Sequence, residues 1–430
     1  MNAATALEVP TEVRAHPGAG ARLMAGVTER EDLARYLTSG GYMPVEDIER
    51  FTEAIDEAGL RGRGGAAFPI GHKIRAVRAG RDEPVVVANG EEGEPASVKD
   101  RWLLRTRPHL VLDGLRLAAL AVGTQEVVVY VSDPASAESV QRAIEELAGH
   151  PAWSVTSRVV KVDPTYVAGE ETAAVQAING GPALPMDKPP RPFEAGVGGR
   201  PTLVSNVETL ANLPLIQALG AQGYREVGTP ASPGTFLLTL SGIDRPGLYE
   251  VPFGITLRAV LEWLGEDLAG VSGALMGGYF SGVADEGVMS VPLDYDSLRD
   301  IGSGLGCGAI AVMRPGCCPV DVSAAVMAYF AQANAAQCGS CFNGTSAMSG
   351  VLQALRDHQA TDQDVQRLRD WSVSLRGRGA CGTLDGATNV AASLLSQFPA
   401  LVNAHVDGRC PVCETGHPVS DPPFVVPAAG

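Results

Sequence analysis

Cysteines have the clearest chemical spacing in this 430-residue chain, and all eight lie in its last third. Cys338-Gly-Ser-Cys341 has the spacing by which two thiolates hold one zinc ion or one iron–sulfur cluster. A redox dithiol or two packed cysteines would have the same spacing. Cys381 could supply a third thiolate, and Cys410-Pro-Val-Cys413 is a second pair that could complete a zinc site with the first. Such crowding indicates metal or redox chemistry before disulfides.

A glycine-rich segment, Gly59-Leu-Arg-Gly-Arg-Gly-Gly-Ala-Ala-Phe-Pro-Ile-Gly71, indicates a loop that approaches an anion. Glycines let backbone N–H groups come close to a ligand, and Arg61, Arg63 and Lys73 supply positive charge. The alternative is a flexible linker, which the spaced cations and the internal Phe-Pro disfavour. The segment therefore predicts a phosphate-bearing ligand.

Two acidic segments follow hydrophobic stretches. Asn89-Gly-Glu-Glu-Gly-Glu-Pro95 comes directly after a predicted strand, and Tyr166-Val-Ala-Gly-Glu-Glu-Thr172 opens a predicted helix. Carboxylates at a strand's end can accept hydrogen bonds from ribose hydroxyls, and the Asn89 amide can bridge a flavin or a base edge. Taken singly, a solvated acidic turn and a capped helix N-terminus explain these segments as well.

The elements that must position these residues alternate between strands and helices. Predicted strands over 84–89 and 126–131 alternate with predicted helices over 110–122 and 135–148, which indicates a parallel α/β sheet with ligands beyond its carboxyl ends. A helix is expected over Val204–Leu219, short strands and turns from Thr235, and helices from Asp321 to about Val406. Residues 1–44 are expected to form an extended or loosely packed arm.

Charge and patterning exclude several classes of protein. The chain has 33 Lys and Arg against 49 Asp and Glu, a formal net charge of -16, which disfavours a nucleic-acid-binding surface and a polybasic membrane anchor. The N-terminus has no apolar stretch of signal-peptide length, so we expect a cytoplasmic protein. The uncharged run Val322–Leu355 is too polar at its centre to insert in a bilayer unaided.

Taken together, these segments resemble the NADH-binding flavoprotein subunit of respiratory complex I and its relatives in NAD-reducing hydrogenases and NAD-dependent formate dehydrogenases. The match covers about residues 45 to 410 in order. The resemblance rests on the glycine-rich segment, the two acidic segments, Lys99-Asp-Arg101, Lys188-Pro-Pro190 and the stretch 201–211. Further on, Pro246-Gly-Leu-Tyr-Glu-Val-Pro-Phe-Gly254 resembles the family's small ubiquitin-like (SLBB) domain.

The resemblance implies an α/β fold class with four parts. An N-terminal arm over 1–44 precedes a Rossmann-like FMN- and NAD(H)-binding domain over 45–234. An SLBB ubiquitin-like α+β domain over 235–320 follows, and then a C-terminal helical domain of the iron–sulfur type with a tail over 321–430.

The resemblance also implies the ligand contacts. In that family one FMN lies in the glycine-rich loop and NADH stacks on its isoalloxazine ring. The implied flavin contacts are Gly62, Arg63, Gly64, Gly65, Lys73, Asn89, Glu91, Asn206 and Thr209. The implied NADH contacts are Phe68, Glu94, Glu171 and Lys188. Further cofactor-binding positions within the same motifs are Glu92, Tyr166, Gly169, Glu170 and Ser205. A hydride passes from nicotinamide to the flavin without a protein acid or base, and Glu94 positions the nicotinamide.

The chain departs from the family in its cysteine motif. The family binds one [4Fe–4S] cluster with four cysteines, and Cys338, Cys341 and Cys381 match the first, second and fourth ligands. Gly344 stands at the third. The cluster is then lost, or it is held by three thiolates with an open or substituted iron, or Cys410 or Cys413 takes the vacant position.

A second departure bears on the nicotinamide cofactor. Arg191 stands where the family usually has a phenylalanine beside the adenine. Either Phe193 replaces that ring from nearby, or Arg191 stacks on the adenine or reaches a 2′-phosphate, so NADPH is an alternative to NADH.

The function expected from the resemblance is that of an FMN-dependent NAD(P)H dehydrogenase subunit. It would pass single electrons to an iron–sulfur protein such as a ferredoxin, alongside other subunits of a redox complex. The alternative is a non-catalytic scaffold subunit with a structural metal or no cluster.

Overall fold

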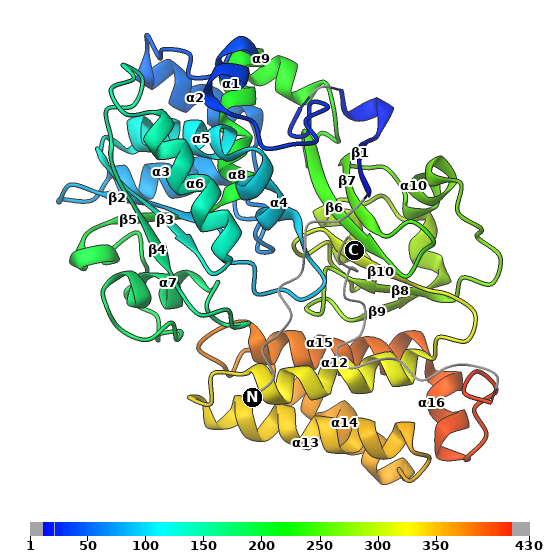
Figure 1. Ribbon diagram of the computed structural model, residues 1–430. Coiled ribbons are helices and arrows are strands. Elements are labelled where there is room, and N and C mark those ends of the chain that lie inside the picture. The colour runs from blue at the N-terminus through cyan, green and yellow to red at the C-terminus, as the bar shows by residue number, and fades with distance from the viewer. Residues whose placement is uncertain (1–11, 21, 415–430) are drawn as a thin grey trace.

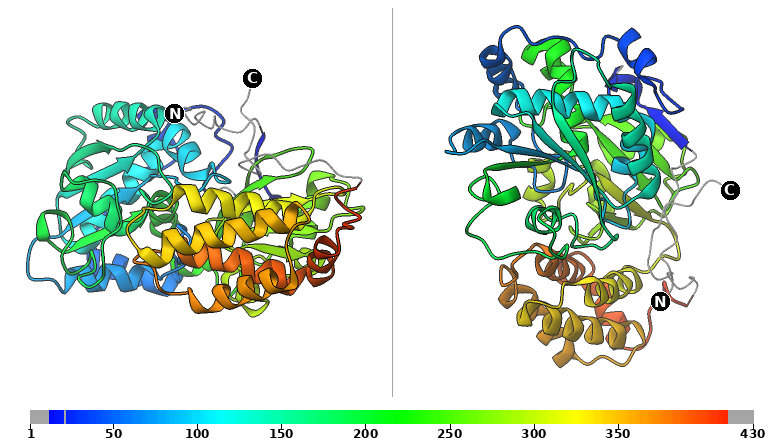
Figure 2. Two further views of the ribbon diagram at one scale, coloured as in Figure 1. Left: turned by 90° about the horizontal axis from the view of Figure 1, so that it is seen from below. Right: turned by 60° about the vertical axis from the view of Figure 1, so that its left-hand side comes forward.

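The computed structural model describes residues 12–20 and 22–414. It consists of three parts: an α/β layer structure, a mixed β-sheet beside it and a helical bundle below both (Figure 1). In Figure 2 the bundle lies across both sheets when the molecule is seen from below (left), and beneath them in the turned view (right). This arrangement confirms the expected fold class.

The α/β part is built on a four-stranded parallel sheet in the order β4-β3-β2-β5. The central strands are runs of valine buried on both faces, as is usual for a parallel sheet covered by helices. The strands are β2 (Val85–Asn89), β3 (Glu126–Val131), β4 (Thr156–Lys161) and β5 (Thr202–Asn206). The helices around the sheet are α2 (Ile48–Ala58), α3 (Ile70–Arg78), α4 (Lys99–Thr106), α5 (Pro108–Val122), α6 (Pro134–Glu146), α7 (Glu171–Ile178), α8 (Val207–Ala211) and α9 (Leu213–Arg225).

The strand order places a switch point between β2 and β5. The chain runs from β2 outward to β3 and β4, and then returns to add β5 on the other side of β2. Asn89 and Asn206, the last residues of β2 and β5, are register partners. Ligands of open α/β sheets bind beyond the carboxyl ends of strands at such a point, so the topology marks the crevice beyond these two asparagines.

The helix expected over Val204–Leu219 is wrong at its start. Residues 202–206 form β5, and the helical chain begins at Val207, where the Asn206 side chain accepts a hydrogen bond from the Glu208 N–H. An apolar run of this length fits a buried strand as well as a helix, and pairing with β2 decides for the strand.

The second sheet has the order β1-β7-β6-β10-β8-β9. β6 and β7 form an antiparallel pair, and β10 lies parallel to β6. Helix α10 (Leu257–Leu264) contributes its apolar face to the core of this part. The strands are β1 (Glu12–Ala15), β6 (Thr235–Ser241), β7 (Gly247–Pro252), β8 (Gly273–Met276), β9 (Val283–Asp285) and β10 (Ala309–Met313), and the short helix α11 (Tyr295–Asp300) precedes β10.

The expected loose arm over 1–44 is packed where the structure describes it, over residues 12–20 and 22–44, and residues 1–11 and 21 lie outside the described residues. β1 pairs with β7 and so extends the second sheet. Helix α1 (Leu33–Thr38) and the residues around it pack on the α/β part, where Leu23, Tyr36 and Tyr42 are buried. The Tyr36 hydroxyl donates to the Asp113 carboxylate at 2.9 Å. Buried aromatic residues spaced among polar ones gave no regular pattern from which this packing could be predicted.

The bundle comprises five helices in its described part: α12 (Pro319–Ala333), α13 (Gly339–Arg356), α14 (Asp362–Ser374), α15 (Thr383–Gln397) and α16 (Pro399–Val406). Its core contains Met327, Phe330, Met348 and Leu394. Among the described residues, no helix is both long and apolar enough to cross a membrane.

Candidate functional site

The glycine-rich loop leaves a stretch of backbone unpaired at its tip. Its two sides are held together by a bridge between Arg61 and Pro69 and by a hydrogen bond from the Gly62 N–H to the Phe68 carbonyl at 2.9 Å. At the exposed tip, the N–H groups of residues 64–66 donate to no acceptor in the described part of the chain. Gly65 has a φ of +107°, which favours glycine. Consecutive free N–H groups form an anion-binding concavity, which suits a phosphate.

Arg63 belongs to the loop, but its side chain faces away from the tip. The guanidinium is 2% exposed and donates to the carbonyls of Arg61 and Thr235 at 2.9 and 3.2 Å. It also lies 4.4 Å over the Phe253 ring. The side chain is therefore paired against the second sheet, and the flavin contact predicted for Arg63 stays a prediction. Its backbone N–H donates to Thr209 Oγ1 at 2.8 Å, which anchors the loop to α8.

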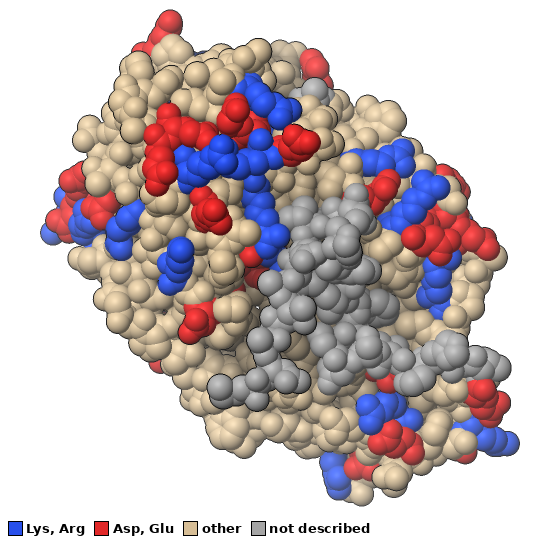
Figure 3. Space-filling view, viewed as in Figure 1, with Lys and Arg blue, Asp and Glu red and all other residues tan. Residues whose placement is uncertain are grey.

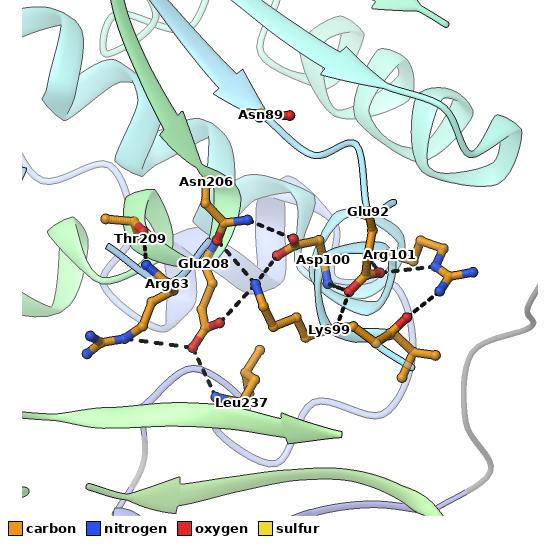
Figure 4. Close-up of polar contacts among 12 residues, drawn as sticks. Arg63, Asn89, Glu92, Lys99, Asp100, Arg101, Asn206, Glu208, Thr209 and Leu237 are labelled. Atoms are coloured by element: carbon orange, nitrogen blue, oxygen red, sulfur yellow. Dashed lines mark hydrogen bonds and ion pairs between the residues drawn. The ribbon is translucent and has the colours of Figure 1, made fainter. Parts of the chain in front are cut away.

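The two asparagines at the strand ends differ in their hydrogen bonds. Asn89 Nδ2 donates to the Gly169 carbonyl at 2.8 Å, so it joins the two acidic segments. Asn206 Nδ2 donates to Asp100 at 2.7 Å, and its Oδ1 accepts from Lys99 at 3.2 Å (Figure 4). A ligand in the crevice would therefore meet Asn206 with its polar atoms already engaged.

A buried ion network lies behind the crevice (Figure 4). Lys99 Nζ contacts carboxylate oxygens of Asp100 and Glu208 at 2.6 and 3.1 Å, and all three side chains are at least 95% buried. Burial lowers the pKa of Lys99, but the carboxylates of Asp100 and Glu208 outweigh this effect and raise it above its ordinary range. Glu208 also accepts from the Leu237 N–H of β6 at 2.9 Å. The network thus joins the α/β part to the second sheet.

Glu92 belongs to this network and not to the crevice. Its oxygens accept from Ser97 Oγ and from the backbone N–H of Asp100 at 2.6 and 3.1 Å, and they pair with Arg101 at 3.0 Å (Figure 4). Its cofactor-binding role stays a prediction, and in the structure both oxygens fix the start of α4.

Two other carboxyl groups of the same segment are less engaged. Glu91 is 6% exposed, and neither of its oxygens has a hydrogen-bond partner in the described part of the chain. Burial raises its pKa to about 8. Glu94 accepts from the Ala96 N–H at 3.3 Å, and burial likewise raises its pKa to about 8. A Cβ on Gly278 would overlap the Glu94 carboxyl, so the turn after β8 closes on this group. Both groups could bind a ligand's hydroxyl or amide.

We expect Glu91→Gln to stabilise the flavin-free chain near pH 8 and not near pH 4.5. The folded chain keeps the Glu91 proton up to about pH 8, whereas the unfolded chain releases it near 4.5. Wild-type stability therefore falls as the pH rises between these values. Glutamine removes that loss. We expect the free energy of unfolding to rise by about 1–3 kcal/mol, less than the full loss because a buried amide without hydrogen bonds is itself unfavourable. Urea unfolding at both pH values measures it. An equal gain at both would contradict the titration of Glu91.

Paired charges lie at the other side of the crevice. Lys73 Nζ contacts Glu171 at 3.2 Å, and Lys188 Nζ contacts Glu170 at 2.5 Å and Glu171 at 4.0 Å. Glu170 also caps α7 by accepting from two backbone N–H groups. Phe68 is 51% exposed on the rim of the loop, where its ring is available for stacking. The structure thus gathers four of the predicted charged residues in one cluster.

Three further predicted positions line the same region. A Cβ on Gly169 would lie 2.7 Å from Glu91 Oε2, so the second acidic segment approaches the first closely. Ser205 is buried beside Asn206 on β5. The Tyr166 ring packs edge-on against Tyr329 and Phe330 of α12 at centroid distances of 5.8 and 5.3 Å. Tyr166 therefore joins the α/β part to the bundle.

A cleft of about 910 Å³ lies apart from the loop tip and the strand ends. It runs between the chain after β4 and the end of α12, and Tyr166 is the one predicted site residue that lines it. The free N–H groups of the loop tip and the polar side chains at the ends of β2 and β5 therefore indicate the candidate ligand crevice, whereas the volume of this cleft does not.

Three cysteines of the expected cluster motif lie together at the start of α13. The Ala380 N–H donates to Cys338 Sγ at 3.4 Å, which places Cys381 and Cys338 side by side. Burial, and then the neighbouring thiols of Cys381 and Cys338, raise the pKa of Cys341 to about 11. At Gly344, a Cβ would lie 2.7 Å from Leu375 Cδ1. Leu375 therefore fills the space that a fourth cysteine would need.

The pairing of the two Cys-x-x-Cys segments is wrong. Cys410 and Cys413 lie beside Cys318 and His405, and not beside Cys338 and Cys341. Helix α16 contacts the far end of α13, where His405 Nδ1 lies 2.9 Å from the Leu355 carbonyl, and its His405 Nε2 lies 3.3 Å from Cys318 at the start of α12. The alternative in which Cys410 or Cys413 replaces the missing cluster ligand is excluded for the same reason.

Comparisons with known proteins agree with this geometry. The model of the Nuo51 FMN-binding domain matches residues 55–215, and that of the NADH-ubiquinone oxidoreductase-F iron-sulfur binding region matches residues 321–405. An F-type subunit of the NADH-quinone oxidoreductase of Rhizobium meliloti is 32% identical over 402 residues, which cover 88% of this chain and 96% of that protein. The NADP-reducing hydrogenase subunit HndC of Solidesulfovibrio fructosivorans is 30% identical over 408 residues, 90% of this chain and 83% of that protein.

A solved structure has the same fold. The crystal structure of an NAD+-reducing [NiFe]-hydrogenase in the H2-reduced state superposes with a TM-score of 0.77 at 28% identity, covering 88% of this chain and 67% of that chain. Fold and site together define a flavin-dependent oxidoreductase. Within that class, the chain belongs to the family of NADH-binding flavoprotein subunits, as the motifs indicated. It has the FMN-binding region and the iron–sulfur region of an NADH dehydrogenase module.

Proposed function

We propose that the chain binds FMN at the glycine-rich loop, holds NAD(P)H beside it and delivers single electrons to an iron–sulfur protein such as a ferredoxin. The observation that carries this proposal is the row of free N–H groups over residues 64–66 at the strand switch point. FMN, when bound, supplies the chemistry that accepts a hydride and releases electrons one at a time. The uncommitted Glu91 and the loop tip fit a ligand with a phosphate and hydroxyl groups.

The residues of this chain would orient the two ligands. Gly64 and Gly65 would bind the phosphate through their N–H groups, and Asn89 and Glu91 would face the flavin from the end of β2. On the nicotinamide side, Phe68 would stack on an aromatic ring and Glu94, at its raised pKa, would meet the carboxamide. None of these groups transfers a proton, so their effect is to position the donor and exclude water.

The charge cluster would serve the donor's ribose and phosphate groups. Lys73 and Lys188 are each paired with a glutamate, so the cluster holds a near-neutral set of donors and acceptors. Arg191 is exposed and lies three residues after Lys188 in the sequence. The NADP-reducing hydrogenase subunit HndC is 30% identical to this chain. Both nicotinamide cofactors should therefore be compared as donors.

The surface around the cysteine set suits an electron acceptor. Phe342, next to Cys341, is 43% exposed, and the stretch 322–355 has no charged residue. Figure 3 shows this part of the bundle, at the lower left, nearly free of charged side chains. An uncharged face beside the cysteines would bring a partner iron–sulfur protein close to them.

Anaerobic spectroscopy tests the proposed function. The purified chain, reconstituted with FMN, should show the visible absorption of a bound flavin, and NADH or NADPH should bleach it. Oxidised ferredoxin should then restore the absorption. A chain that retains no FMN, or retains it without bleaching by either nucleotide, would overturn the proposal and favour a scaffold subunit.

We expect Gly344→Cys together with Leu375→Ala to raise the iron and acid-labile sulfide content of the reconstituted chain. A cluster held by Cys338, Cys341 and Cys381 has one iron without a cysteine ligand, and the double variant supplies both the thiolate and the space for it. Gly344→Cys alone should gain less, because Leu375 must move. Electron paramagnetic resonance of the reduced protein should show a stronger [4Fe–4S] signal, and an unchanged iron content in the double variant would contradict this.

A further inference from the structure

A second group of metal-ligand side chains lies at the far end of the bundle from the FMN crevice. It comprises Cys318, the residue that caps α12, His405 in the last turn of α16, and Cys410 and Cys413 of the segment that follows. We propose that these four residues bind one zinc ion, in a site separate from the cysteines of the iron–sulfur region.

The distances match the edges of a tetrahedron. Cys318 Sγ and Cys410 Sγ are 4.0 Å apart, and His405 Nε2 lies 3.3 Å from Cys318 Sγ and 3.6 Å from Cys413 Sγ. A tetrahedral zinc with Zn–S bonds of about 2.3 Å and a Zn–N bond of about 2.0 Å holds two thiolates about 3.8 Å apart, and a thiolate about 3.5 Å from a nitrogen. All four donor atoms lie within 4.8 Å of one another.

The histidine is oriented as a metal ligand requires. His405 Nδ1 lies 2.9 Å from the Leu355 carbonyl, an acceptor, so the proton is on Nδ1 and Nε2 has a free lone pair toward the three sulfurs. The His405 ring is fully buried, and the His358 ring stacks on it at 4.6 Å with planes 13° apart. The ring is thus held in one orientation by a hydrogen bond on one side and stacking on its face.

The donor set favours a single zinc ion over an iron–sulfur cluster. A cluster places several iron and sulfide ions between its ligands and spreads them farther apart than these contacts allow. Three thiolates and one imidazole in a closed tetrahedral arrangement are a structural zinc set. Cys318 and Cys410 are 3% and 1% exposed, and with His405 and the exposed Cys413 they make four ligands, which leaves no open position for the water that a catalytic zinc would bind.

The site would tie the end of the bundle to its beginning. Cys318 precedes α12, whereas Cys410 and Cys413 follow α16, so one ion would link residues 92 positions apart. The stretch 410–414 forms turns without a helix or strand to hold it. A metal would thus fix a segment that no regular secondary structure holds in place.

Metal analysis of the full-length chain tests the proposal, with adjacent cysteines as a matched pair. The chain, free of any affinity tag, is purified from medium that contains zinc and iron, and its zinc, iron and acid-labile sulfide are measured. We expect about one zinc per chain in the wild type and in the controls Cys317→Ser and Cys381→Ser. Cys318→Ser and the surface variant Cys413→Ser should each lower bound zinc at least about 10-fold after dialysis.

Cobalt provides a second readout on the same protein. After exchange of the zinc for Co2+, the wild type should show the intense thiolate-to-cobalt and ligand-field bands of a tetrahedral site, and Cys413→Ser should weaken them while keeping the wild-type circular dichroism. Zinc that persists in both site variants, zinc that is lost equally in Cys317→Ser, or a Cys318–Cys410 disulfide in the purified chain would each overturn the proposal.

Discussion

Replacing Gly65 by alanine should lower the affinity of the chain for FMN about 10- to 100-fold. Gly65 has a φ of +107°, which a residue with a Cβ rarely adopts, so alanine shifts the loop tip. The shift turns at least one N–H group away from the phosphate, and a hydrogen bond to a charged group is worth about 1.5–3 kcal/mol. Quenching of flavin fluorescence on titration with the apoprotein measures the affinity.

Gly123 offers the matched control. It has a φ of +81° in the left-handed cap of α5, and a Cβ there meets nothing within 4 Å. Gly123→Ala should therefore cost a similar backbone strain, about 1–2 kcal/mol of stability, without a change in FMN affinity. Equal FMN affinity in Gly65→Ala and the wild type would place the phosphate away from the loop tip.

Replacing Lys99 by methionine should cost about 3–5 kcal/mol of folding stability, the largest effect on stability that we expect. Lys99 is the cation between Asp100 and Glu208, and removal of one partner leaves buried carboxylates uncompensated. Chemical unfolding of the flavin-free chain measures the loss. Exposed Lys161 on β4 is the control, because Lys161→Met should change stability by less than about 0.5 kcal/mol.

The pH dependence of the Lys99→Met variant has a definite sign. Burial already raises the pKa of Asp100 to about 7 beside Lys99, and loss of the cation should raise it further. The part of the penalty that Asp100 causes is therefore small at low pH and grows as the pH rises above about 7, where the wild-type carboxyl ionises beside its cation. The difference from the wild type should be smaller near pH 5 than near pH 8. A constant difference would indicate that lost packing of the lysine stem causes it.

The sequence predicted the fold class and the family because both rest on ordered local patterns. A run of buried valines followed by a Gly-rich or acidic turn indicates the end of a strand from local sequence alone. The family's motifs also occur in the same order along this chain. The same patterns could not separate ligand contacts from structural ones. Glu91 and Glu92 are neighbours, yet Glu91 is uncommitted and Glu92 is saturated by the start of α4. Only the backbone direction after β2 decides between them.

The group around His405 was beyond prediction for another reason. The Cys410-Pro-Val-Cys413 spacing indicated two ligands of a metal site. The other two, Cys318 and His405, come close to this pair only because of the direction that α16 gives the chain. Cys318 follows another cysteine, and His405 has no motif around it. Nothing in the spacing distinguished Cys318 from Cys317. The same limit applies to Arg63, whose charge suggested a phosphate contact and whose side chain is paired inside the second sheet.

Arg63 also couples flavin binding to the packing of the second sheet against the α/β part. Its backbone belongs to the loop, whereas its guanidinium donates to the Thr235 carbonyl where the second sheet begins. Suppose that a ligand binds the loop only when the second sheet is packed against it. The packed sheet then raises the ligand's binding free energy by a certain amount, and the bound ligand stabilises the packing of the sheet by the same amount. Protease cleavage between Arg225 and Thr235 should therefore slow as FMN saturates the chain. The flavin would serve as a structural element of the interface as well as an electron carrier.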